Sequence, residues 1–117
     1  MSDIEIHDDR DRGLLAAREG GGDGGIVGRI QYFVLDEPRP ALVAAHTLVE
    51  PAHEGKGIAG SLARELYAMA ARESAAVAPL CSFVAHWAER HPGEAPPAPP
   101  ELLRAAREAL AADPGKW

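Results

Sequence analysis

The stretch EPAHEGKGIAGSL, residues 50–62, marks the point where the sequence pattern changes from strand to helix. Before it, ALVAAHTLV at 41–49 is a run of small and branched apolar residues, which is typical of a strand. After it, apolar residues recur every three to four positions from Ile58 to Met69, which predicts one apolar face of a helix over 57–73. The sequence therefore predicts a strand, a glycine turn and a long helix in succession.

The glycine turn has the spacing of a dinucleotide-binding loop, because Gly55, Gly57 and Gly60 spell G-x-G-x-x-G. A Rossmann site also needs an acidic residue closing the next strand and further β-α units. The next apolar run, at 75–80, ends without Asp or Glu, and the segments before the turn are joined like hairpins. A Walker loop is disfavoured because the turn lacks the G-K-[ST] ending.

The glycine turn can still be interpreted as an anion-binding site at the start of a helix. The first N–H groups of a helix have no partner within the helix, and the helix dipole adds positive charge there. Lys56 adds a full charge, so a pyrophosphate fits this position without a Rossmann fold. The alternative interpretation is an ordinary glycine-rich helix start.

The rest of the chain predicts one α+β domain followed by a tethered helix. Short turn-rich links favour an antiparallel meander before the glycine turn, and a buried strand and a helix follow the first helix. The further predicted strands are 3–7, 13–19, 26–35 and 75–80, and the further predicted helices are 82–91 and 101–112. Residues 1–93 form the predicted domain, and 94–117 a Pro-rich linker with the last helix.

Composition narrows the class of protein. The 117 residues allow one core, and a net charge of −6 argues against a nucleic-acid surface. A single cysteine, Cys81, leaves no disulfide within the chain. The sequence has no secretory signal pattern and no run of about 18 apolar residues, so we expect a cytoplasmic protein without a membrane partner.

These motifs in this order resemble the GNAT acetyltransferase superfamily. Residues 54–59, EGKGIA, occupy its acetyl-CoA signature [QR]-x-x-G-x-[GA], with Glu54 in place of the usual first residue. Two blocks are more specific: HTLVEPAHEGKGIAGSLA at 46–63 and VAPLCSFVAHWAERHP at 77–92 resemble the compact YjdJ-type N-acetyltransferases.

The resemblance implies a mixed, mostly antiparallel sheet flanked by helices. Strands 41–49 and 75–80 would run side by side and then splay around the arm of acetyl-CoA. Main-chain groups near Leu48 and Val49 would bind that arm, and the glycine turn would bind the pyrophosphate. The cofactor-binding residues implied are Leu48, Val49, Glu54, Gly55, Lys56, Gly57, Ile58, Ala59 and Gly60.

Acetyl transfer needs a neutral amine, a stabilised oxyanion and a protonated or solvated thiolate. Larger members of the superfamily often use a tyrosine on the helix after the last core strand, but 82–91 holds none. His46 is a candidate base, or else a structural histidine. Cys81, just before a helix, is a candidate acid or nucleophile, or else a small buried residue.

The sequence leaves several functions open. The leading hypothesis is direct attack by an unidentified small-molecule or protein amine on acetyl-CoA. The alternatives are a non-catalytic module that binds or senses CoA, and an interaction protein that acts through its C-terminal helix. We predict no metal site, because His86 and His91, five residues apart on a helix, are poorly placed to chelate one ion.

Overall fold

The computed structural model describes residues 4–19, 25–53, 55 and 57–112. Within these residues, five strands form one sheet in the order β1-β2-β3-β4-β5. The strands are β1 (Ile4–Asp9), β2 (Leu14–Glu19), β3 (Ile26–Leu35), β4 (Ala41–Val49) and β5 (Ala76–Pro79). The helices are α1 (Ile58–Arg72), α2 (Ser82–Arg90) and α3 (Pro100–Ala112), with short 3-10 turns η1 (Arg10–Arg12) and η2 (Pro51–His53).

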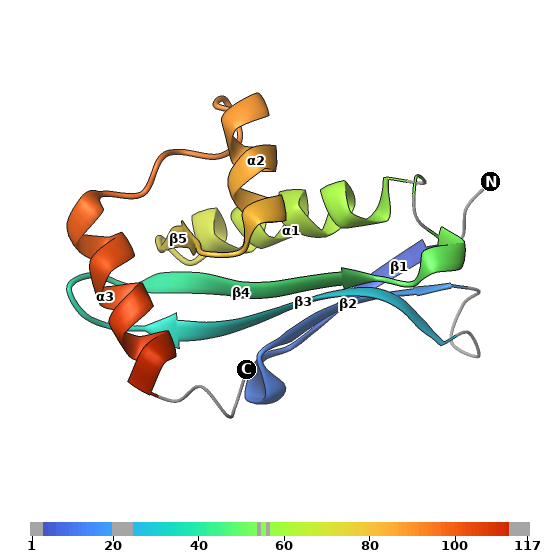
Figure 1. The fold of residues 1–117 in the computed structure, drawn as a ribbon, viewed down its shortest axis with the longest axis horizontal. Coiled ribbons are helices and arrows are strands. Elements are labelled where there is room, and N and C mark those ends of the chain that lie inside the picture. Colours follow the sequence, from blue (N-terminus) through green and yellow to red (C-terminus); the bar gives the residue numbers. More distant parts are fainter. Residues whose placement is uncertain (1–3, 20–24, 54, 56, 113–117) are drawn as a thin grey trace.

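The sheet is mixed, as the sequence predicted. Strands β1 to β4 pair antiparallel, and only β5 joins β4 in parallel. Helices α1 and α2 lie over one face, and α3 lies against the other near the start of β4 (Figure 1). No helix in the described part of the chain is long and apolar enough to cross a bilayer.

Helix α1 packs its predicted apolar face onto the middle of the sheet. Leu62 and Leu66 are fully buried there, in one core cluster with Ile30 and Leu42. Burying a side chain of this size stabilises the fold by about 1.5–3 kcal/mol. Gly28 on β3 lets the first turn of α1 approach closely, since a Cβ built there lies only 2.9 Å from Ile58 Cγ2.

Helix α3 belongs to the same fold. Leu102 and Ala106 are fully buried against the opposite face of the sheet, in a second core cluster with Val43 and Ala78. The C-terminal helix therefore packs on the chain's own sheet. A hollow of about 620 Å³ lies between α1, β5 and the Pro-rich linker.

Strands β4 and β5 part where the sequence predicted a splay. Their register ends at the Ala44–Pro79 pair, and the N–H groups of Leu80 and Cys81 both donate to the carbonyl oxygen of Ala44 at 3.1 Å. The chain then turns into α2, while β4 continues to Val49. This last part of β4, residues 45–49, has no strand beside it on that edge among the described residues.

Candidate active site

A cleft of about 430 Å³ joins the free edge of β4 to the first turn of α1. Six of the nine predicted cofactor-binding residues line it. Leu48 does not, and Glu54 and Lys56 lie outside the described residues. The lining consists of Thr47, Val49, Gly55, Gly57, Ile58, Ala59, Gly60 and Phe83.

The backbone at the start of α1 explains two of the three glycines. Gly55 has a φ of 83° and Gly57 a φ of 78°, a conformation that side chains with a Cβ rarely adopt. Gly57 caps the helix, and its carbonyl accepts the first helical hydrogen bond, from Ser61 N–H at 3.0 Å. The N–H groups of the first turn, which precede that bond, therefore stand at the end of the cleft without helical partners.

The third glycine also has a packing role. Gly60 lines the cleft, but a Cβ built on it lies 3.4 Å from Nε1 of Trp87 on α2. A Cβ at that distance would be in van der Waals contact, so α2 packs directly against this position of α1. Trp87 is buried and stacks on Tyr67, with ring centroids 5.9 Å apart.

The free edge of β4 offers main-chain groups to the cleft. The N–H of Glu50 donates to Val27 on β3 at 2.8 Å, and successive residues of a strand point to opposite sides. Leu48 therefore directs its N–H and C=O groups to β3, whereas Thr47 and Val49 direct theirs to the free edge. The side chain of Leu48 lies on the opposite sheet face and is 53% exposed.

Cys81 lies beside this cleft, at the N-terminus of α2. Its Sγ is 3.0 Å from Oγ1 of Thr47 and accepts from the N–H of Val84 at 3.5 Å. Tyr67 is electrostatically coupled to it: burial, and secondly the charge of the Cys81 thiolate, raises the pKa of the Tyr67 phenol to about 12. The phenol therefore stays protonated at neutral pH. Sequence reasoning did not identify Thr47 or Tyr67, because nothing local ties them to Cys81.

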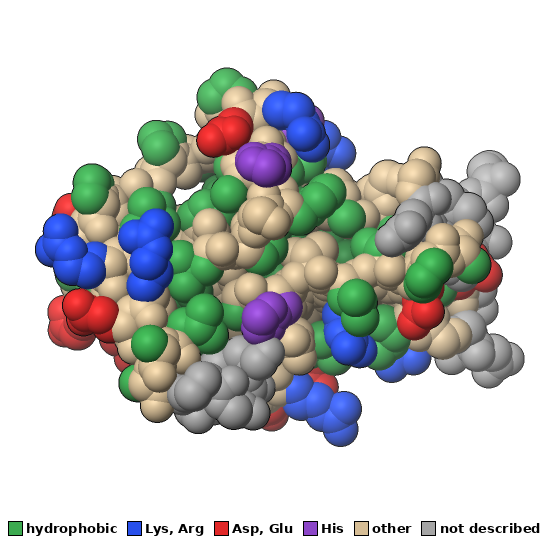
Figure 2. Space-filling view, in the orientation of Figure 1, with side chains coloured by type: hydrophobic (Ala, Val, Ile, Leu, Met, Phe, Trp, Pro, Cys, Tyr) green, Lys and Arg blue, Asp and Glu red, His purple; other side chains and the backbone are tan. Residues whose placement is uncertain are grey.

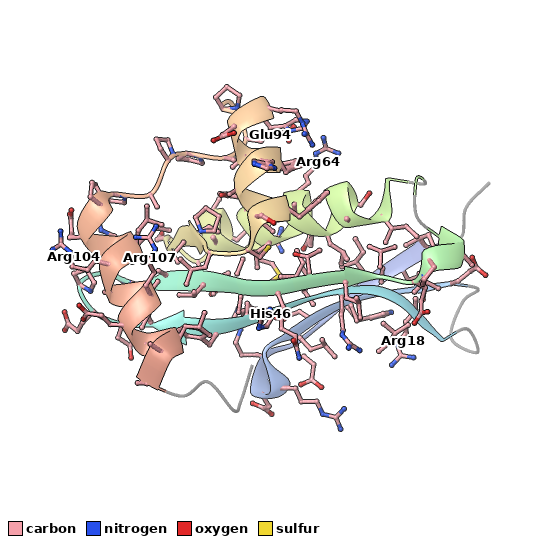
Figure 3. All side chains as sticks on the ribbon, viewed as in Figure 1. Arg18, His46, Arg64, Glu94, Arg104 and Arg107 are labelled. Carbon is pink, nitrogen blue, oxygen red and sulfur yellow. The ribbon has the colours of Figure 1, made fainter. Side chains whose placement is uncertain are left out.

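His46 lies on the other face of the sheet. It adjoins Thr47 in an extended strand, so its side chain points away from Cys81, and it is exposed (Figure 3). A β-bulge causes this orientation. Gln31 pairs with His46 but Tyr32 pairs with Ala44, which leaves one extra residue in β4. The two predicted catalytic side chains therefore flank the free edge of β4 from opposite faces.

Comparison with known proteins identifies the family. The family model for GCN5-related N-acetyl-transferases matches residues 16–96. The chain therefore belongs to this family, which confirms the superfamily and the acyltransferase class predicted from the sequence. None of the curated proteins matches the chain.

Two solved structures match part of the chain. A ribosomal-protein-alanine N-acetyltransferase from Brucella melitensis biovar Abortus 2308 is 26% identical, with a TM-score of 0.52, over 76% of this chain and 67% of that one. An aminoglycoside acetyltransferase from an uncultured soil metagenomic sample is 30% identical, with a TM-score of 0.46, over 55% of this chain. This chain spans only 42% of the latter protein.

Proposed function

We propose that this protein is a compact, YjdJ-type acetyltransferase that transfers an acetyl group from acetyl-CoA to an amine. The observation that supports this most is the cleft, which joins the glycine-rich start of α1 to a free strand edge and ends beside a cysteine sulfur. A pyrophosphate suits the N–H groups of the first turn of α1. An amide-containing arm suits the free edge of β4, where it would pair like an added strand.

The opposite placement of His46 and Cys81 fits direct attack. The amine nitrogen attacks the thioester carbon, and the C–S bond then breaks. His46, on the open face, accepts the proton that the amine loses. Cys81, on the α1 face, protonates or hydrogen-bonds the departing thiolate, while Thr47 holds its sulfur at the cleft.

Two other functions use the same features differently. A non-catalytic module that binds CoA would need the cleft but neither His46 nor Cys81. A covalent route would place the acetyl group on Cys81 first. We favour direct attack because it needs no second transfer, and we disfavour a partner role for α3 because Leu102 is buried in the chain's own core.

Thermal unfolding with CoA, acetyl-CoA and NADH tests the donor. A ligand that binds only the folded state raises the melting temperature, so we expect CoA and acetyl-CoA to raise it and NADH not to. Gly57→Val should abolish the CoA shift, because a branched side chain is strained at this φ and crowds the cleft. Gly93→Val, at a glycine with nothing within 4 Å, is the matched control.

Free-thiol release from acetyl-CoA, measured with a panel of amines, tests the reaction. Release that depends on both the amine and His46 supports acetyl transfer. Stabilisation by NADH alone would refute the proposed donor. Binding of CoA without thiol release for any amine would favour the non-catalytic module, and an acetyl group on Cys81 that passes to an added amine would favour the covalent route.

A further inference from the structure

The face of the sheet that carries His46 also carries two arginines. Arg29 on β3 lies opposite Leu48 in the β3–β4 register, and Arg18 lies on the same face of β2. Both arginines are half-buried. Figure 3 labels Arg18 and His46 on this side of the sheet, and Figure 2 shows a histidine and basic side chains along the same surface.

Neither guanidinium has a carboxylate partner among the residues that the structure describes. Glu5 lies opposite Arg18 in the β1–β2 register, but its carboxylate contacts His7 instead, at 3.4 Å. Glu50, just after β4, pairs with neither arginine. Five other arginines of the chain do form ion pairs: Arg10, Arg12, Arg39, Arg64 and Arg72.

The two arginines lie close together in a chain that is acidic overall. Arg29 is opposite Ala16, and Arg18 is two residues further along β2, so they are diagonal neighbours about 7–8 Å apart at their backbones. Like charges at such positions repel each other. An anion bound between them removes this repulsion and gains charge-assisted hydrogen bonds.

The same register places Arg29 close to the proposed base. Gln31 pairs with His46, so Arg29 and His46 are also diagonal neighbours, again about 7–8 Å apart at their backbones. The exposed Leu48 lies opposite Arg29 and two residues from His46 on β4, and it offers an apolar surface beside both. An amine held at His46 can therefore reach Arg29 with an anionic group a few bonds away.

We propose that the open face selects acceptors that carry a carboxylate or phosphate a few bonds from the reactive amine. Arg29 binds the anionic group, Arg18 adds to the positive field, and the carbon chain between the two groups lies over Leu48. This specificity rests on the proposed acetyl transfer. The same site should also bind an amine with an anionic group when no acetyl group is transferred.

Matched acceptors test the specificity. We would measure kcat/KM for 4-aminobutyrate and for its neutral amide, in the parent protein and in Arg29→Gln and Arg104→Gln. Arg104 is the matched control because it is exposed and unpaired in the described part of the chain, on α3 away from His46 (Figure 3). The expected preference for the anionic acceptor is about tenfold, the scale of one charge-assisted hydrogen bond. Arg29→Gln should remove this preference, whereas Arg104→Gln should keep it.

Equilibrium binding of 4-aminobutyrate in the presence of CoA separates this proposal from the proposed reaction. Binding that Arg29→Gln weakens about tenfold, and Arg104→Gln does not, supports the acceptor site even if no amine is acetylated. Transfer to the neutral amide at a rate equal to that for 4-aminobutyrate would overturn the specificity and leave the acetyltransferase intact. Equal binding by the parent and Arg29→Gln would overturn it as well.

Discussion

Replacing Gly28 with alanine should disturb the contact between β3 and α1 beside the proposed cofactor cleft. The new Cβ would lie 2.9 Å from Cγ2 of Ile58 and 3.3 Å from Cγ2 of Val49, whereas carbon atoms pack best at about 3.5–4.0 Å. Overpacking of this kind costs about 1–3 kcal/mol, and alanine regains about 0.5–1 kcal/mol over glycine in a strand. We expect a net loss of about 1 kcal/mol in the free energy of unfolding.

Because Ile58 and Val49 also line the cleft, the same change should weaken CoA binding. Urea unfolding measures the stability, and the thermal shift at saturating CoA measures the binding. Gly93→Ala is the matched control, since a Cβ there meets nothing within 4 Å. In an Ile58→Ala background the clashing methyl group is gone, so Gly28→Ala should cost less there than in the parent. An equal cost in both backgrounds would refute the packing argument.

Three further changes test the surroundings of the site. Thr47→Val removes the hydroxyl that lies 3.0 Å from Cys81 Sγ, so iodoacetamide should alkylate the cysteine several-fold more slowly at pH 8; an unchanged rate would mean that the hydroxyl does not stabilise the thiolate. Tyr32→Phe removes the partly buried hydrogen bond to Asp8 and should lower the free energy of unfolding by about 1 kcal/mol, measured in urea, whereas no loss would show the bond to be neutral. Burial raises the pKa of Tyr67 to about 12, so the stability that the neutral phenol contributes is complete below about pH 10 and is lost as the pH rises through 12. The free energy of unfolding of Tyr67→Phe should therefore fall less over that pH range than that of the parent. Parallel pH profiles of the two proteins would contradict this.

Much of the fold follows from patterns that act locally. Ile58, Leu62, Leu66 and Met69 recur at helical spacing, and all four are buried in α1. Residues 41–45 of β4 and the residues of β5 are apolar because both of their faces are covered, by α1 and α2 on one side and by α3 on the other. Element boundaries differ by one or two residues, since hydrogen bonds at strand and helix ends depend on neighbours distant in sequence.

The candidate site was harder to predict because it depends on long-range pairing. Thr47 and Cys81 are 34 residues apart, and only the register of β4 with β5 brings them together. The three glycines share one spacing, yet two have a positive φ and the third lies inside α1 against Trp87, which is on another helix. Spacing alone does not separate these two causes.

The orientation of His46 shows how one residue decides the chemistry available to the site. With regular alternation from Ala44, which faces α1, His46 would point to the α1 face as well. The bulge in β4 adds one residue, so Thr47 takes that face and His46 turns to the open one. Under the proposed function, a base and a sulfur on the same face would crowd the thioester from one side. Because the strand edge separates them, His46 can take the proton of the amine and Cys81 can serve the departing thiolate. In that arrangement the amine arrives over the face that carries the arginines.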